Sequence, residues 1–100
     1  MGACEFTQRA KGKTAKEAFS AAVEHARYEH GHGGYSGTLA EKGTFVLIQD
    51  RTVSTEKEAY AEVDRLMQEG DSRIDDKWGP AGCIRVGDTD TFVFFGWASS

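Results

Sequence analysis

The chain has 100 residues, of which 39% are hydrophobic, so its size suits one domain with a single core. Its 12 basic and 16 acidic residues leave a net charge of −4, which disfavours nucleic acid as a partner because phosphate neutralisation supplies most non-specific affinity. No apolar run approaches the roughly 18 residues that a membrane helix needs, and no signal peptide is evident. Cys4 and Cys83 lie far apart and form no Cys-x-x-Cys pair, which is typical of reduced thiols in the cytoplasm. We expect residues 1–100 to form one cytoplasmic domain that binds neither nucleic acid nor membrane.

The first two predicted elements are a strand and a helix. Apolar and polar residues alternate over residues 4–10, which predicts a strand with one buried face. Residues 14–17, Thr-Ala-Lys-Glu, form a capping box, in which the Thr and Glu side chains satisfy free amides of a first helical turn. Apolar residues follow at helical spacing, so we expect a helix that runs to about His30 and stops at Gly31.

A glycine-rich loop and a hairpin are predicted next. Residues 31–37 contain four glycines and cannot form a regular helix. Residues 38–40 have the pattern of a short strand, and residues 44–48, Thr-Phe-Val-Leu-Ile, that of a strongly apolar one. A short turn separates the two runs, which predicts a hairpin.

The second half of the chain repeats this order of elements. Residues 55–58, Thr-Glu-Lys-Glu, form a second capping box, and the helix that follows should end at Gly70. Residues 71–81 are predicted to be a long irregular connection. Residues 83–86 and 91–97 should form the last two strands, joined by a turn.

The two halves indicate an internal repeat. Residues 14–48 and 55–95 each contain a capped helix, a Gly-x-x-Gly loop and a hairpin, with the loops at residues 34–37 and 79–82. We interpret this as a duplicated αββ unit after one extra strand. The predicted fold is α+β, in the order βαββαββ. Two such units usually place both helices on one face of a shared antiparallel sheet, which is ferredoxin-like with an added strand.

The two Gly-x-x-Gly loops are the predicted binding site. Glycines let backbone amides approach a ligand closely, and aromatic and charged residues on loops are typical of recognition. The candidate ligand- or partner-binding residues are His32, Gly34, Tyr35, Gly37, Asp75, Asp76, Lys77, Trp78, Gly79 and Gly82. The alternative is structural, with the glycines serving the fold and Trp78 packing over the sheet edge.

A Glu-His pair is a weaker catalytic candidate. Glu29 and His30 fall beside the apolar stripe of the first predicted helix and could act as an acid–base pair. We favour the alternative that they anchor the glycine loop, with His30 also stabilised at the negative end of the helix. Ser36 does not sit in a Gly-x-Ser-x-Gly elbow, so nucleophilic catalysis has little support.

The histidines also raise the question of a metal. His30 and His32 resemble a ligand pair, but zinc needs at least three protein ligands, which Cys4, Cys83, Asp75 or Asp76 would have to complete. No His-Glu-x-x-His or Cys-x-x-Cys spacing is present. The pattern therefore favours a protein with no metal and no cofactor.

Two stretches carry a resemblance to known sequences. Residues 27–38, Arg-Tyr-Glu-His-Gly-His-Gly-Gly-Tyr-Ser-Gly-Thr, and residues 77–84, Lys-Trp-Gly-Pro-Ala-Gly-Cys-Ile, resemble motifs of a group of small uncharacterised bacterial and bacteriophage proteins. The resemblance covers most of the chain. It implies a bacterial or phage setting and brings no activity and no residue roles. Small phage proteins are often inhibitors or ligand sequesterers, which is an association with the group.

These observations favour a non-enzymatic binding protein, such as a phage inhibitor of a host defence protein. The first alternative is a small-molecule or nucleotide binder that uses the two Gly-x-x-Gly loops. The second is a small metal-dependent or Glu-His enzyme. The expected partner is a host protein or a small ligand, and a homodimer is left open.

Overall fold

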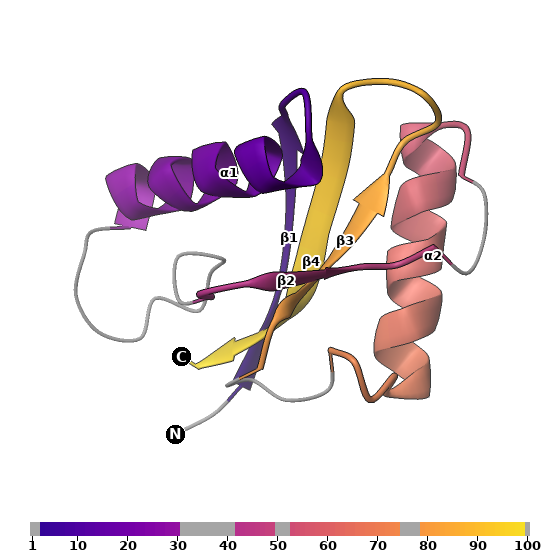
Figure 1. Cartoon of the computed structure of the whole chain (residues 1–100). Helices are drawn as coiled ribbons and strands as arrows, with labels where there is room; N and C mark the ends of the chain where they lie inside the picture. Colours follow the sequence, from indigo (N-terminus) through magenta and orange to yellow (C-terminus); the bar gives the residue numbers. More distant parts are fainter. Residues whose placement is uncertain (1–2, 31–41, 50–52, 75–78, 100) are drawn as a thin grey trace.

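The computed structural model describes residues 3–30, 42–49, 53–74 and 79–99 (Figure 1). Two helices and four strands occur in these ranges. In chain order they are β1 (Ala3–Lys11), α1 (Ala15–His30), β2 (Phe45–Leu47), α2 (Glu56–Glu69), β3 (Ala81–Arg85) and β4 (Thr91–Ser99). The α+β class is confirmed, as are both helices and the first and last strands. The predicted strand at residues 38–40 lies outside the described residues.

The four strands form one mixed sheet in the order β1-β4-β3-β2. β4 lies between β1 and β3 and pairs antiparallel with both, whereas β2 pairs parallel with β3. The segment β2–α2–β3 is therefore a βαβ unit, in which a helix connects two parallel strands. No helix in the described ranges is long and apolar enough to cross a membrane.

The two helices cover opposite faces of the sheet (Figure 1). Alternate residues of β4 divide between two cores, because successive side chains on a strand point to opposite faces. Phe92 and Phe94 pack with α1, and Val93 and Phe95 pack with α2. The α1 core also contains Phe6, Ala18, Ala22, Val23, Ala81, Cys83 and Ala98. The α2 core contains Ile48, Val53, Ala59, Val63, Leu66, Met67, Ile74, Ile84 and Val86.

The prediction of an antiparallel, ferredoxin-like sheet with both helices on one face was wrong. β4 is apolar on both sides, so both of its faces need a covering layer, and a helix on each side provides it. The partner of β2 within the described residues is β3, in parallel, and α2 makes the connection. The duplicated αββ unit stays a prediction, because part of its first copy lies outside the described residues.

Both helix starts have the predicted capping box. At α1 the backbone N–H of Glu17 donates to Thr14 Oγ1 at 3.1 Å, and the Glu17 carboxylate accepts from the Lys13 N–H at 3.1 Å. At α2 the N–H of Glu58 donates to Thr55 Oγ1 at 3.1 Å, and its carboxylate accepts from the Ser54 N–H at 3.3 Å. The side chains thus satisfy amides that lack a partner within the helix.

The end of α2 is closed by Gly70 and Asp71. Gly70 adopts the left-handed conformation with φ 65°, and its N–H and that of Asp71 donate to carbonyls of the last turn. The Asp71 carboxylate accepts the backbone N–H of Arg73 at 2.9 Å and its guanidinium at 2.7 and 2.9 Å. These bonds hold the turn that leads to Ile74, which is buried in the α2 core.

A close approach between β3 and β4 explains one glycine. A Cβ added to Gly82 would lie 2.4 Å from the ring of its cross-strand neighbour Phe95. That ring is completely buried, so it cannot move aside without disturbing the α2 core.

We predict that Gly82→Ala lowers the free energy of unfolding by about 1–3 kcal/mol, the usual cost of overpacking a core. Urea unfolding followed by circular dichroism would measure the change. Gly43→Ala is the matched control, since nothing lies within 4 Å of the added Cβ. An equal loss in both variants would contradict the packing role of Gly82.

The Asp71–Arg73 pair predicts a specific dependence of stability on pH. Hydrogen bonds from Arg73 lower the pKa of Asp71 from 3.8 to about 2. The stabilisation is therefore complete above the unfolded-state pKa and is lost as pH falls towards 2. Asp71→Asn should cost at most about 1 kcal/mol at neutral pH, because the pair is partly solvent-exposed. Measured as a function of pH, the unfolding free energies of wild type and Asp71→Asn should become equal as the pH falls towards 2. A difference that stays constant with pH would contradict the role of the ion pair.

Candidate functional site

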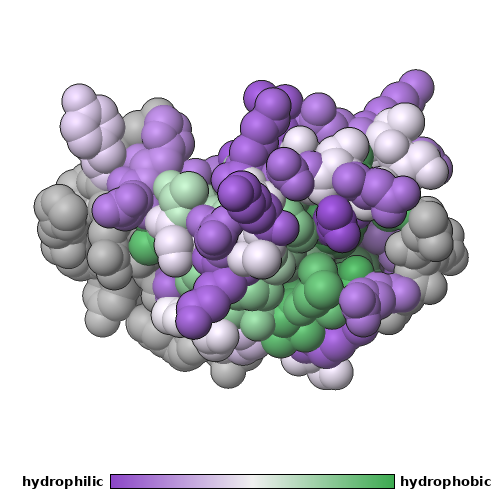
Figure 2. Space-filling model, turned by 45° about the horizontal axis from the view of Figure 1, so that its top comes forward, coloured by the Kyte–Doolittle hydropathy of each residue, from purple (hydrophilic) through white to green (hydrophobic). Residues whose placement is uncertain are grey.

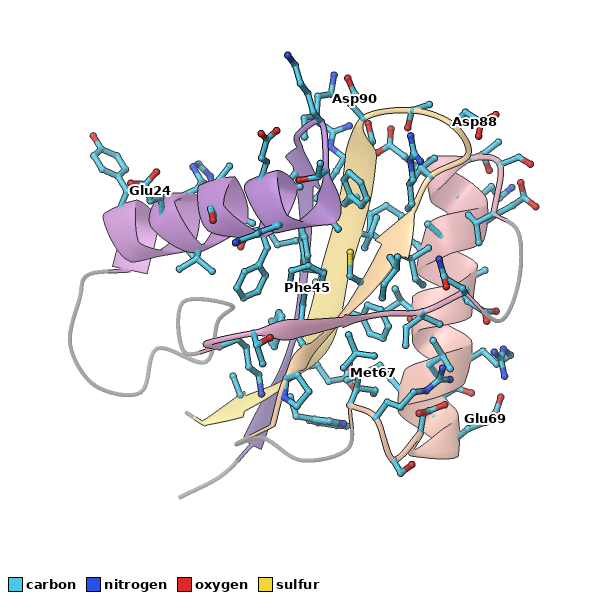
Figure 3. The ribbon with its side chains drawn as sticks, in the orientation of Figure 1. Glu24, Phe45, Met67, Glu69, Asp88 and Asp90 are labelled. Carbon is cyan, nitrogen blue, oxygen red and sulfur yellow. The ribbon has the colours of Figure 1, made fainter. Side chains whose placement is uncertain are left out.

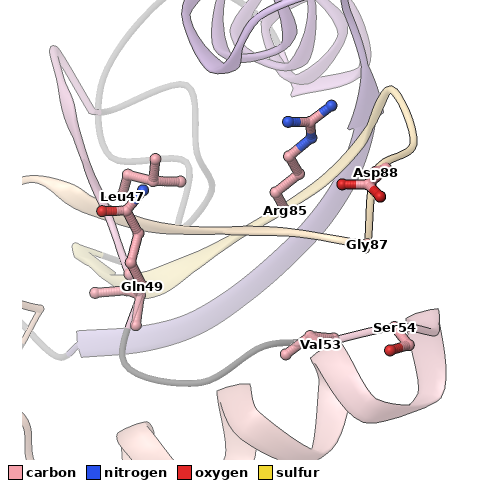
Figure 4. Close-up of a pocket in the computed structure, with 8 residues that line it drawn as sticks. Leu47, Gln49, Val53, Ser54, Arg85, Gly87 and Asp88 are labelled. Carbon is pink, nitrogen blue, oxygen red and sulfur yellow. The ribbon is translucent and has the colours of Figure 1, made fainter.

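An open pocket of about 390 Å³ lies at the carboxyl ends of β2 and β3 (Figure 4). It is lined by the residues that end or follow these strands and by those that precede α2. They are Leu47, Ile48, Gln49, Val53, Ser54, Arg85, Gly87 and Asp88. In open sheets with parallel strands, ligands bind in the crevice at the carboxyl ends of the strands. The pocket therefore occupies the place where this topology most often carries function.

Arg85 is the cation of this pocket. Its Nε donates to the carbonyl oxygen of Thr89 at 3.0 Å, and its guanidinium lies 5.9 Å from the ring centroid of Phe92. Phe92 is buried and pairs with Arg85 across the sheet, so the surface beneath the guanidinium is rigid. Within the described ranges, Arg85 has no salt bridge. The side chain is thus oriented by its own strand pair and keeps its two terminal nitrogens for another group.

Hydrogen bonds fix the turn after β3 and connect it to the segment that precedes α2. Gly87 has φ +56°, which favours glycine, and its N–H donates to the Val53 carbonyl at 2.6 Å. The N–H and the hydroxyl of Thr89 both donate to the carbonyl of Val86. The turn is therefore bonded to the segment that precedes α2, and the two walls of the pocket are connected through the backbone.

The amino end of α2 does not supply a positive site here. Thr55 Oγ1 accepts the N–H of Glu58, the Glu58 carboxylate accepts the N–H of Ser54 just before the helix, and Glu56 adds a second negative charge. These carboxylates offset the positive end of the helix dipole. The charge that an anion would meet in the pocket is therefore that of Arg85, while Asp88 places an exposed carboxylate on the rim.

The pocket also presents apolar surface on the sheet face that carries Arg85. Leu47 pairs in register with Cys83, and Arg85 lies two residues further on the same face of β3, so Leu47 and Arg85 share the face covered elsewhere by α1. The Leu47 side chain is 37% exposed. Figure 2 shows an apolar area framed by hydrophilic side chains on the face that it presents. An exposed aliphatic residue in the same pocket as an arginine that has no described salt bridge is typical of a binding surface.

Most of the predicted binding residues lie outside the described part of the chain. These are His32, Gly34, Tyr35, Gly37, Asp75, Asp76, Lys77 and Trp78. Of the other two, Gly82 is buried beneath Phe95, so packing accounts for it. Gly79 accepts a hydrogen bond at 2.9 Å from Nζ of Lys42, which is buried and lies 6.0 Å from the ring centroid of Phe6.

The second predicted loop, residues 79–82, lies beside the segment that precedes β2, and its last two residues, Ala81 and Gly82, belong to β3 and not to a loop. Lys42 contacts Gly79, and the N–H of Ala81 donates to the carbonyl of Thr44 at 3.0 Å. Both segments belong to the amino ends of β2 and β3. These contacts lie at the amino ends of β2 and β3, opposite to the carboxyl ends where the Arg85 pocket is found.

The candidate catalytic and metal residues are only partly placed. Glu29 and His30 belong to the last turn of α1, as predicted, but their side chains and all of His32 lie outside the described atoms. In the described ranges no three His, Cys, Asp or Glu side chains cluster as metal ligands would. Cys83 is completely buried, which raises the pKa of its thiol to about 12 and makes it a poor nucleophile.

The sequence analysis missed Arg85 and Asp88. Residues 85–88, Arg-Val-Gly-Asp, do carry a usable signal, namely charged residues that follow an apolar strand directly. These charged residues predict a site only when β3 is known to run parallel to β2. Only in a parallel pair do the carboxyl ends of the two strands lie together.

Comparison with known proteins gives no relative for this chain. No family model matches it, and searches of curated proteins and of solved structures found no match.

Proposed function

We propose that the protein is a non-enzymatic binding protein that acts on another protein through the Arg85 pocket. One observation carries the proposal: Arg85 is oriented by Thr89 and Phe92 yet has no carboxylate partner in the described ranges. An arginine that is oriented before binding loses little conformational entropy when a partner binds it. Arginine is also among the residues that most often dominate protein interfaces.

The surroundings of Arg85 favour a protein partner. Leu47 offers exposed apolar surface in the same pocket as Arg85, and Asp88 and Ser54 supply polar groups at the rim. Apolar centres with polar rims are typical of protein interfaces. The partner should present a carboxylate to Arg85, because a guanidinium that loses its water in an interface needs a charged hydrogen-bond partner. It should also present an apolar side chain to Leu47.

The proposal includes a bacterial or phage setting, which is the setting that the predicted resemblance of residues 27–38 and 77–84 implies. In that setting the partner is a host protein in the bacterial cytoplasm, such as a component of a defence system. The protein would inhibit it by occupying a surface, which requires no catalytic group of its own.

A small-ligand function is the second candidate, and the pocket itself favours it. Its volume of about 390 Å³ falls within the range of small-molecule sites, about 300–1,000 Å³. Arg85 would bind a phosphate or carboxylate, and Leu47, Ile48 and Val53 would contact the apolar part of the ligand.

Affinity capture from host lysate tests the protein-binding proposal. Wild type should retain a partner that Arg85→Ala retains at least about tenfold less well, since an arginine hot spot contributes about 2 kcal/mol or more. Lys57→Ala is the matched control, because Lys57 is an exposed cation on α2 whose side chain does not line the pocket. The purified pair should show the same order of affinities in calorimetry. Equal binding by all three proteins, or no retained partner, would overturn the proposal.

Thermal denaturation tests the small-ligand candidate. Nucleotides and small dicarboxylates should raise the melting temperature of wild type and of Lys57→Ala, because a ligand that binds only the folded state stabilises it. The same ligands should leave Arg85→Ala unchanged. The absence of a shift with any of them would remove this candidate and leave the protein-binding proposal standing.

A further inference from the structure

β1 has a long outer edge. It spans nine residues, Ala3–Lys11, and pairs with β4 on one side only, since it is the first strand of the sheet order. Among the described elements, none lies beside its other side (Figure 1). A strand edge of this length presents unpaired N–H and C=O groups, which a second strand can bind.

The hydrogen-bond pattern shows which residues face this edge. In an antiparallel ladder, opposed residues alternate between pairs that exchange hydrogen bonds and pairs that do not. Gly12 donates to Asp90 at 3.0 Å, and these two residues continue the register of β1 and β4. The even-numbered residues of β1 therefore bond to β4, and the N–H and C=O groups of the odd-numbered residues point outward.

The outward-facing residues have a symmetrical charge pattern. Thr7 is the midpoint of Ala3–Lys11, with Glu5 two residues before it and Arg9 two residues after it. All three are exposed, and their side chains lie on the face of the sheet opposite to α1. A twofold axis through Thr7 exchanges the positions of a negative and a positive side chain.

We propose that two copies of the chain pair antiparallel through β1, with the twofold axis at Thr7. Glu5 of each copy then lies opposite Arg9 of the second copy, so the interface contains the ion pair twice. Arg9 also binds Glu56 in its own chain at 3.0 Å through Nη1. A guanidinium has five N–H donors, so Arg9 can bridge both carboxylates. Glu5 keeps its contacts within its own chain, since a carboxylate accepts several hydrogen bonds.

The charges of β1 favour the register centred on Thr7 over the other antiparallel registers. It pairs all nine residues of β1, whereas any sliding of one copy leaves strand ends unpaired. The register centred on Glu5 opposes two glutamates, and the register centred on Arg9 opposes two arginines, and like charges opposite each other are destabilising. The pattern thus permits a closed dimer and disfavours the other pairings through which exposed edges aggregate.

The dimer is tested with variants in which one charge of β1 is reversed. Light scattering during size-exclusion chromatography gives the molar mass of each full-length protein. Wild type should have twice the mass of the chain. Glu5→Lys and Arg9→Glu should each have the mass of one chain, because each variant opposes like charges twice. An equimolar mixture of the two variants should recover the doubled mass. In the mixed pair the introduced lysine faces the introduced glutamate, and the unchanged Arg9 of one copy faces the unchanged Glu5 of the other, so both contacts are again attractive.

Controls separate the interface from folding. Arg9→Glu also breaks the Arg9–Glu56 pair, whereas Glu5→Lys leaves that pair intact, and circular dichroism should show both variants folded. Lys16→Glu reverses an exposed charge in α1, outside the paired strand β1, and should keep the doubled mass. A wild-type mass of one chain, or a mixture that stays at that mass, would overturn the proposal. Either result leaves the Arg85 proposal unaffected, because the pocket is formed at β2 and β3, at the opposite end of the strand order from β1.

Discussion

The fold depends on the burial of β4 on both of its faces. Phe92 and Phe94 point into the α1 core, and Val93 and Phe95 into the α2 core, so one strand contributes large side chains to both hydrophobic layers. Figure 3 shows the side chains that fill the space between each helix and the sheet. Neither helix could cover both faces, which accounts for the three-layer arrangement and for the place of β4 between β1 and β3.

The site follows from this arrangement. Since α2 must reach the face away from α1, the chain passes from β2 across that face and returns in β3, and the two strands end parallel. Their carboxyl ends meet at one edge, where the turn after β3 is bonded to the segment before α2. Arg85 is then held above Phe92, and it forms no salt bridge with a described carboxylate.

Local signals in the sequence predicted the local structure well. The boxes at Thr14 and Thr55 located both helix starts, because capping chemistry depends on residues a few positions apart. The sheet topology and the pocket were missed, because strand order and direction depend on contacts distant in sequence. The one available clue was the run Thr91–Trp97, which is apolar at successive positions and so indicates burial on both faces. That clue could have excluded helices on a single face, although it could not have identified Arg85.

The pairing of β1 with β4 has a consequence for how the chain reaches its fold. Ala3 lies opposite Ser99, so the first strand and the last form the longest ladder of the sheet, and residues from near the two ends of the sequence lie side by side (Figure 1). Contacts between such distant residues form slowly, because the intervening chain must first lose entropy. On the ribosome, β1 emerges early and has no partner until β4 has been made. The α1 core, which needs Phe92 and Phe94, must therefore form after translation of the domain and not during it.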